Sequence, residues 1–237
     1  MSIFDQKVIK YEMKPLSSLE KVFPDETPVY RMECQMLSGL WGETVSFQVA
    51  YTGDFVMRER LDVRVVSELA EHVHVRTVEM VPVGRATNGI VDDNYLKTTS
   101  GLYPDLLKDL KDGKVIVYSR QWRSLWVDVD ITNEIPAGEY EIELQFIKEG
   151  EVVCSAKQKV TVIGTELPKL DIMHTEWMHA DCLADYYHVE VFSEEHWKLL
   201  ENYFQEYVKR DCNMMLTPLF TSPLDTAIGL ERTTCQL

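Results

Sequence analysis

The sequence carries little positive charge. Its 237 residues include 24 Lys and Arg against 39 Asp and Glu, the formal net charge is -15, and no basic run exceeds two adjacent residues. Such a chain repels phosphate backbones and anionic lipid headgroups. We therefore expect neither nucleic acid nor a membrane as its partner.

The sequence also lacks long apolar runs, a disulfide pattern and the common nucleotide-binding and serine-hydrolase motifs. No stretch approaches the roughly 18 apolar residues of a membrane span, and the initial MSIFDQKVIKYEMKP lacks a signal-peptide core. The five cysteines are at least 23 positions apart and form no CxxC, which is typical of reduced thiols. No GxGxxG, P-loop or GxSxG motif occurs. We expect a cytoplasmic protein without cofactor or metal.

What the sequence does contain is a long region with strand periodicity. Between about residues 7 and 163, apolar and polar residues alternate as in strands with one buried face. Pro136 with Gly138, and Glu149 with Gly150, mark reversals. Seven or so antiparallel strands with short turns predict a mainly β fold, an immunoglobulin-like β-sandwich over residues 1–163. The clearest alternating stretches are 45–50, 61–66, 73–81, 125–131, 139–146 and 156–163.

Two further segments of this half draw an interpretation. PDLLKDLKDG, Pro104–Gly113, predicts one or two helical turns. Asp25 and Glu26 are the only adjacent Asp-Glu pair, but they lie between Pro24 and Pro28, so we expect a turn there and not an acid/base pair.

The period changes after residue 163. Residues 164–169 have the composition of a linker, and the chain then reads as strand, loop, helix and strand. Ser193 is a good N-cap for a helix that ends near Lys209, and Trp197, Leu200, Phe204 and Val208 form its apolar face. NMMLTPLF, which follows, is suited to a parallel strand buried on both faces.

A single β-α-β unit cannot cover two such strands. We therefore expect the chain to be the front part of something longer, and the incomplete segment offers exposed edges for self-association.

The most unusual stretch is HTEWMHADCLADYYHVE, residues 174–190, which gathers histidines, carboxylates and aromatics. It follows the first strand of the β/α unit, which in a β/α barrel is the active-site face, and we expect a loop of about seventeen residues before the helix. TPLFTSPLDTAIGLER occupies the matching position after the second strand. Two such loops suggest one shared cleft.

Four interpretations of this stretch compete. Zinc could use His174, His179, Asp181, Cys182 or His188, but no pair has a recognised ligand spacing. Cys182 as a nucleophile would need an orienting partner and an oxyanion site that nothing marks. The polar side chains could simply satisfy one another in an irregular loop. The fourth interpretation is a sugar subsite, where an aromatic face stacks on the ring and carboxylates and histidines bind its hydroxyls.

At these residues a family resemblance appears. HTEWMHADCLADYYHVEVFSEEHW and NMMLTPLFTSPLDTAIGLERTTCQL resemble the start of the catalytic barrel of glycoside hydrolase family 123-like proteins, also grouped as domain of unknown function family 4091. VPVGRATNGIVDDNYLKTTSGLYPDLL and QWRSLWVDVDITNEIPAGEYEIEL are similar to the β-sandwich that precedes it.

The resemblance implies a β-sandwich (1–163), a linker (164–169) and an incomplete β/α (TIM-type) barrel (170–237). It also implies hydrolysis of β-linked N-acetylhexosamine glycans, such as those of N-acetylgalactosamine, by a retaining mechanism in which the substrate's acetamide attacks. The family's catalytic Asp-Glu pair lies in a later strand, so no catalytic residue is carried over. The residues carried over as substrate-binding cleft walls are Glu176, Trp177, His179, Asp181, Asp225 and Arg232.

Three hypotheses follow. The chain is the N-terminal portion of a glycoside hydrolase, inactive by itself; or the sandwich is a non-catalytic carbohydrate-binding module; or it is only a structural scaffold.

Overall fold

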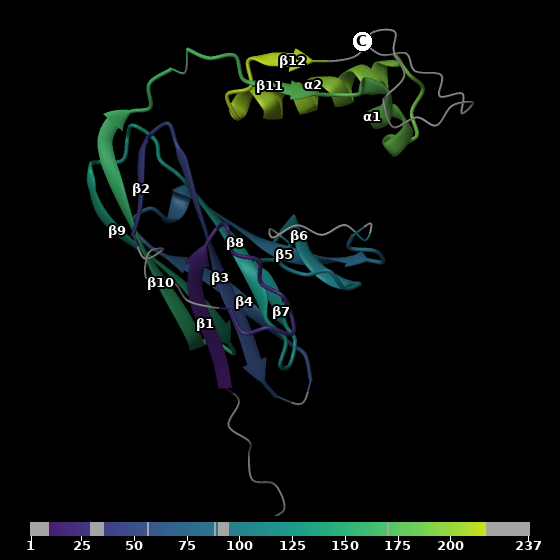
Figure 1. Ribbon diagram of the computed structural model, residues 1–237. Coiled ribbons are helices and arrows are strands. Elements are labelled where there is room, and N and C mark those ends of the chain that lie inside the picture. Colours follow the sequence, from purple (N-terminus) through teal and green to yellow (C-terminus); the bar gives the residue numbers. More distant parts are fainter. Residues whose placement is uncertain are drawn as a thin grey trace, which may run out of the picture. The chain divides into compact units, whose positions relative to one another are not determined.

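The computed structural model describes residues 10–28, 36–55, 57–87, 89, 95–169 and 171–216. The chain divides into two compact units, Met1–Leu167 and Pro168–Leu237, which we call unit 1 and unit 2 (Figure 1). Strands dominate the described residues, so the prediction of a mainly β protein is confirmed. No helix within these residues is long and apolar enough to cross a membrane.

Unit 1 contains two five-stranded sheets, which we call sheet A and sheet B. Sheet A has the order β1-β3-β8-β5-β6 and sheet B the order β2-β10-β9-β4-β7. Sheet A consists of β1 (Lys10–Ser17), β3 (Thr44–Asp54), β8 (Arg123–Asp130), β5 (Val73–Val83) and β6 (Gly101–Asp109). Sheet B consists of β2 (Met36–Trp41), β10 (Glu151–Glu166), β9 (Gly138–Lys148), β4 (Glu59–Val66) and β7 (Lys114–Val117). A short 3-10 helix, η2 (Ala70–His72), precedes β5.

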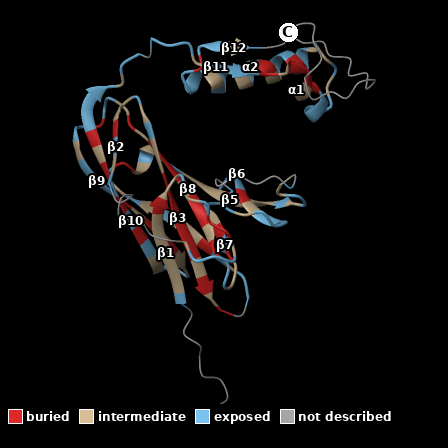
Figure 2. Ribbon diagram, viewed as in Figure 1, coloured by how far each residue is buried: buried red, intermediate tan, exposed pale blue. Residues whose placement is uncertain are grey.

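The two sheets share one apolar core. Phe47 and Val49 of β3 and Leu125 of β8 meet Leu144 and Phe146 of β9 in a single cluster of buried side chains, and buried segments of both sheets are red in Figure 2. Core positions recur at every second residue because successive side chains of a strand point to opposite faces. The alternation in the sequence therefore located these strands correctly.

The pairing of the strands differs from the sequence prediction at one place. All pairs in the two sheets are antiparallel except β2 with β10, which is parallel, with Lys159 beside Met36 and Ile163 beside Leu40. The expectation of antiparallel strands alone was therefore wrong. β10 also runs to Glu166, so the first part of the segment interpreted as a linker is strand. The immunoglobulin-like type of the sandwich stays a prediction.

The predicted turn at Glu149-Gly150 is confirmed. Both residues have positive φ, 52° and 89°, as a two-residue hairpin with right-handed strand twist requires. The same geometry recurs at Asp112 and Gly113, with φ of 55° and 65°.

The helical turns predicted at Pro104–Gly113 are wrong, because most of this segment belongs to β6. It pairs with β5, and the register shifts by one residue, so that Glu79 faces Leu106 and Met80 faces Pro104. The extra residue, Asp105, is a β-bulge. A bulge interrupts the period of two and leaves the leucines with a spacing that looks helical.

The described part of unit 2, residues 168–169 and 171–216, contains two short parallel strands and two helices. They are β11 (Thr175–Trp177), α1 (Ala180–Tyr187), α2 (Glu194–Lys209) and β12 (Met214–Leu216). The Ser193 side chain accepts a hydrogen bond from the His196 amide at 3.2 Å, which confirms the predicted N-cap. The expected seventeen-residue loop was wrong, because α1 occupies its middle.

The strands of unit 2 are not buried on both faces. Met214 is 42% exposed and Leu216 is 44% exposed, whereas Met215 between them packs with Leu200 against the helices. The prediction of a doubly buried strand is therefore wrong for the described part of NMMLTPLF; its residues 217–220 lie outside the described residues. In the described part of unit 2, the helices therefore cover only one face of the strand pair β11–β12.

A polar contact ties the two sheets of unit 1 together. Tyr11 of β1 donates its hydroxyl to Glu59 of β4 at 2.8 Å, and Lys148 of β9 lies 2.7 Å from the same carboxylate oxygen. The hydrogen bond from Lys148 lowers the pKa of Glu59 below its usual value. Burial acts in the opposite direction, and the hydrogen bond from Tyr11 adds to the lowering. Burial and the Glu59 carboxylate raise the pKa of Tyr11, so its hydroxyl stays a donor.

We expect Glu59→Gln to destabilise unit 1 at neutral pH. A carboxyl whose pKa is lowered by folding stabilises the fold above its unfolded pKa and loses that contribution as the pH falls through the folded value. Urea unfolding is measured from pH 7 down to about pH 3, across the ordinary carboxyl pKa. The difference in free energy of unfolding between wild type and variant should narrow as the pH falls. Glu134→Gln, at an exposed position, is the control. A gap that stays constant with pH would contradict the assignment.

Candidate functional site

The described cleft-wall candidates lie on β11, at the start of α1 and in the connection between them. Asn213, just before β12, holds the entry of β11: its Oδ1 accepts from the His174 amide at 3.0 Å, and its Nδ2 donates to the Ile172 carbonyl at 2.8 Å. Glu176 and Trp177 follow on the strand, and His179 is the N-cap residue of α1. A residue 39 positions away thus fixes where the cluster begins.

Glu176 and Trp177 are brought close in sequence but point to opposite faces. They are consecutive in a strand, so their side chains alternate. His174 Nε2 lies 3.3 Å from Glu176 Oε1, which places that pair on one side. The Trp177 side chain is 66% exposed and offers a free aromatic face. One ring-sized ligand on this strand therefore contacts the Trp177 face or the Glu176 face.

His179 and Asp181 each carry a buried polar atom with no partner. Asp181 is 4% exposed, and its Oδ1 makes no hydrogen bond within the described residues; the Nδ1 of His179 is in the same state. Leaving such a group unsatisfied costs about 1–3 kcal/mol, so each one calls for a reason. Two of the four described cleft-wall candidates therefore hold unused hydrogen-bonding capacity.

His196 fixes the start of α1 against α2. It is fully buried; its Nδ1 accepts from the Phe192 amide at 3.0 Å, and its Nε2 lies 2.8 Å from the Ala180 carbonyl oxygen. Since a carbonyl can only accept, Nε2 carries the proton and Nδ1 is the acceptor. The sequence interpretation missed this residue. The sequence signal that could have found it is its position three residues after the N-cap Ser193, where its amide donates to the Ser193 side chain.

The predicted apolar face of α2 is only partly covered. Leu200 is buried, but Trp197, Phe204 and Val208 are 44%, 39% and 68% exposed. The Trp197 ring instead stacks on Phe192 at 5.9 Å between centroids. Of the predicted apolar face, only Leu200 is therefore buried within the described residues.

The remaining candidates give no further geometry. Among the described residues, no group of three His, Cys, Asp or Glu could hold a metal ion. Cys182 is half-buried in the first turn of α1, and His188 ends the helix in the left-handed conformation with φ 57°. Asp225 and Arg232 lie outside the described residues.

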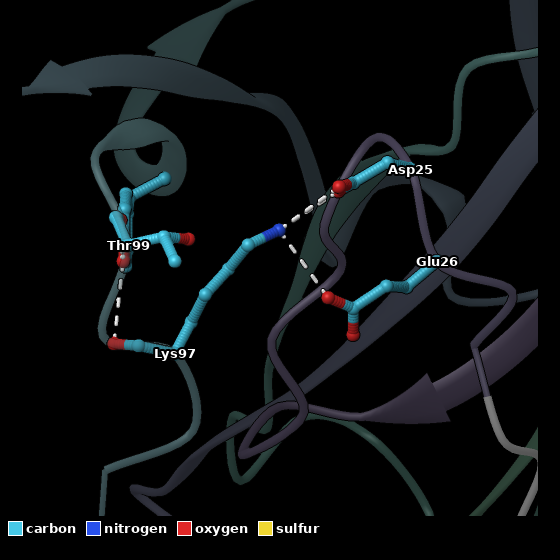
Figure 3. Close-up of polar contacts among 5 residues, drawn as sticks. Asp25, Glu26, Lys97 and Thr99 are labelled. Carbon is cyan, nitrogen blue, oxygen red and sulfur yellow. Dashed lines mark hydrogen bonds and ion pairs between the residues drawn. The ribbon is translucent and has the colours of Figure 1, made fainter.

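The Asp25-Glu26 pair is occupied by a lysine. Lys97 Nζ lies 3.0 Å from Asp25 and 3.3 Å from Glu26 (Figure 3). Its ammonium lowers the pKa of Asp25, the opposite of what a general acid requires. The pair is a structural anchor for the chain near Lys97.

Comparison with known proteins gives a match to a family model and a structural likeness that extends over most of the chain. Residues 177–237 match the model described as the catalytic domain of glycoside hydrolase 123. A family 123 glycoside hydrolase from Clostridium perfringens, studied for glycolipid glycan hydrolysis, superimposes with a TM-score of 0.60 at 14% identity, over 84% of this chain. The chain spans 36% of the length of that enzyme. It is thus similar to family 123 in sequence at its C-terminal end and in fold over most of its length.

Other likenesses are weaker. A β-glucosidase from Listeria innocua gives a TM-score of 0.31 at 10% identity, over 68% of this chain and 17% of that enzyme. AvmM, a macrocyclization catalyst of alchivemycin A biosynthesis, gives 0.33 at 11% identity, over 69% and 93%. Neither likeness is strong enough to inform the fold or the function. No curated protein matches the sequence.

We expect His196→Ala to release α1 from α2. The change removes the acceptor of the part-buried Phe192 amide and the donor of the buried Ala180 carbonyl, and it leaves a cavity, at a cost of about 2–4 kcal/mol. Amide hydrogen exchange of residues 180–187 should accelerate strongly, whereas His188→Ala, at an exposed position, should leave α2 and the start of α1 unchanged. Unaltered exchange in His196→Ala would refute the anchoring role.

Proposed function

We propose that this chain is the N-terminal portion of a glycoside hydrolase that acts on β-linked N-acetylhexosamine glycans of the N-acetylgalactosamine type. The observation that carries the proposal is the match of residues 177–237 to the family 123 catalytic domain. The fold likeness to a hydrolase of glycolipid glycans agrees with a glycan substrate. Unit 2 is then the start of a β/α barrel and unit 1 the immunoglobulin-like sandwich that precedes it.

The proposed chemistry is the retaining, substrate-assisted reaction implied by the family resemblance. The oxygen of the substrate's 2-acetamido group attacks the anomeric carbon, a Glu acts as acid and base, and a neighbouring Asp orients the acetamide. That pair lies beyond residue 237 in the family. Asp25 and Glu26 do not replace it, because Lys97 holds both carboxylates.

The role proposed for this chain is to supply one wall of the sugar cleft. Trp177 offers an exposed ring for stacking on a pyranose. His179 and Asp181 keep unused hydrogen-bonding atoms that sugar hydroxyls could satisfy. Because Glu176 lies on the other face of β11, we assign it to orienting His174, at 3.3 Å, and not to the same sugar ring as Trp177. Asp225 and Arg232 complete the proposed wall.

A second candidate function concerns unit 1 alone, as a non-catalytic carbohydrate-binding or structural module. It is favoured by one observation: both sheets close on a core made entirely of unit 1 residues. Self-association through the exposed apolar residues of unit 2 and a cytoplasmic location remain proposals of the same kind.

We expect the 237-residue chain by itself to show no glycosidase turnover. Loss of a general acid alone costs about 10²- to 10⁴-fold, and here the partner carboxylate would be missing as well. Release of the aryl group from an aryl N-acetyl-β-hexosaminide, followed against a buffer blank, is the measurement. Turnover above the blank would mean that the acid/base pair lies within these residues.

In a protein that carries the whole barrel, we expect Trp177→Ala to weaken substrate binding by about 1–3 kcal/mol through loss of a stacking surface. Trp197→Ala is the matched control, because this second exposed indole stacks on Phe192. Chelators should change neither binding nor activity. Equal losses in the two variants, or inactivation with loss of bound zinc on chelation, would count against the cleft assignment.

A further inference from the structure

Unit 1 contains a cleft whose charge is opposite to that of the chain. We call it the cationic cleft; it has a volume of about 580 Å³ and is lined by six cationic side chains and three anionic ones. Six minus three leaves a local excess of three positive charges, in a chain whose net charge is -15. The cations are Arg58, Arg60, Lys108, Lys111, Lys114 and Arg123.

The cleft lies where the inward face of sheet A stops being apolar. On β8, Leu125 and Val127 are core residues, and Arg123, two positions earlier, shares their face. On β5, Val75 packs against the core, and Thr77 and Glu79 continue the same face. A charged side chain directed between two sheets is costly unless something compensates it.

Several of these cations lack a counter-ion. Arg60 pairs with Asp112 at 3.0 Å and Lys114 with Asp62 at 3.2 Å. In the described part of the chain, by contrast, Arg58, Lys108 and Lys111 form no ion pair. These two ion pairs therefore cancel only part of the positive charge of the cleft.

Arg123 is held in place yet keeps a free donor. Its guanidinium lies 4.9 Å from the centroid of the Tyr118 ring, and its Nη2 donates to the Gln121 side chain at 3.2 Å. Its Nε is buried and has no partner among the described residues. A guanidinium fixed in this way presents a ready donor to an oxyanion.

Tyr51 supplies a second polar group of the cleft. It stands opposite Arg123 in the β3–β8 register, is 3% exposed and lines the cleft. Burial raises the pKa of its phenol, so the hydroxyl stays protonated. A phenol donor on β3 therefore lies beside the Arg123 guanidinium of β8 in the same cleft.

We propose that the cationic cleft binds an anionic saccharide, a sugar that carries a carboxylate or a sulfate ester. The oxyanion is bound by Arg123 with Lys108 and Lys111. Glu79, which accepts the Thr77 hydroxyl at 2.8 Å through one oxygen, has a second oxygen for ring hydroxyls. The volume is within the usual range of small-molecule sites. A polyanion without hydroxyls fits less well, because Glu79 and Asp109 would repel it.

This inference does not rest on the proposed hydrolase function, since every residue it uses belongs to unit 1. Calorimetric titration of the 237-residue chain tests it with four sugars and one ion. D-glucuronate and D-galactose 6-sulfate are the anionic probes, glucose and galactose their neutral counterparts, and inorganic sulfate the ion. We expect at least one anionic sugar to bind about tenfold or more tightly than its neutral counterpart, as a charge-assisted hydrogen bond provides.

The pattern of binding identifies the source of the oxyanion. Binding of glucuronate alone assigns the site to carboxylates, and binding of the sulfated sugar alone assigns it to sulfate esters. The proposal is overturned if neither anionic sugar binds at about 10 mM, which is about tenfold above the Kd of a weak site of about 1 mM. It is equally overturned if the neutral sugars bind as tightly as the anionic ones, or if inorganic sulfate binds as tightly as the anionic sugars.

Variants of the same chain locate the site. Arg123→Gln and Lys108→Gln should each weaken binding of the anionic sugar about tenfold or more. Lys159→Gln, which removes the same charge from an exposed position of β10, should leave the affinity within about twofold, as a distant screened charge predicts. Circular dichroism establishes whether Arg123→Gln is folded. If it is not, the affinity of the Lys108→Gln variant, which changes an exposed residue, tests the site. Folded variants that bind like the wild type would refute the assignment.

Discussion

The apolar core shared by the two sheets is the constraint on which unit 1 depends. Because side chains alternate along a strand, the strands that build the core must place an apolar residue inward at every second position, as Phe47, Val49 and Leu125 do. Inward charge is tolerated only where the sheets leave room for it. The place of the cationic cleft follows from this constraint, since Arg123 occupies the inward position two residues before Leu125.

Much of unit 1 could be predicted because its information is local. Alternation predicted the long strands, and Glu149-Gly150 predicted a hairpin that the backbone angles confirm. The two errors have non-local causes. The bulge at Asp105 is stabilised by pairing with β5, and the parallel contact of β2 joins residues more than a hundred positions apart. Period and turn chemistry describe a strand, not its partner.

Unit 2 shows the same limit at a smaller scale. The capping chemistry of Ser193 is written in the sequence, so α2 could be predicted closely. α1 could not, because its N-cap residue makes no side-chain capping bond and the helix start is held from outside by His196. The sequence could not predict the opposite directions of Glu176 and Trp177, because they depend on a three-residue strand that pairs with β12.

The parallel pairing of β10 has a mechanical consequence. β10 is the last strand before unit 2, and it lies between β9 on one side and β2 on the other. Tension that enters unit 1 through Leu167 along the strand loads the hydrogen bonds to both neighbours in shear, together, and does not peel them apart singly. The Leu167 amide also donates to the Trp41 carbonyl at 2.8 Å, which extends the clamp to the last residue of unit 1. Unit 1 is thus built to resist pulling at its exit.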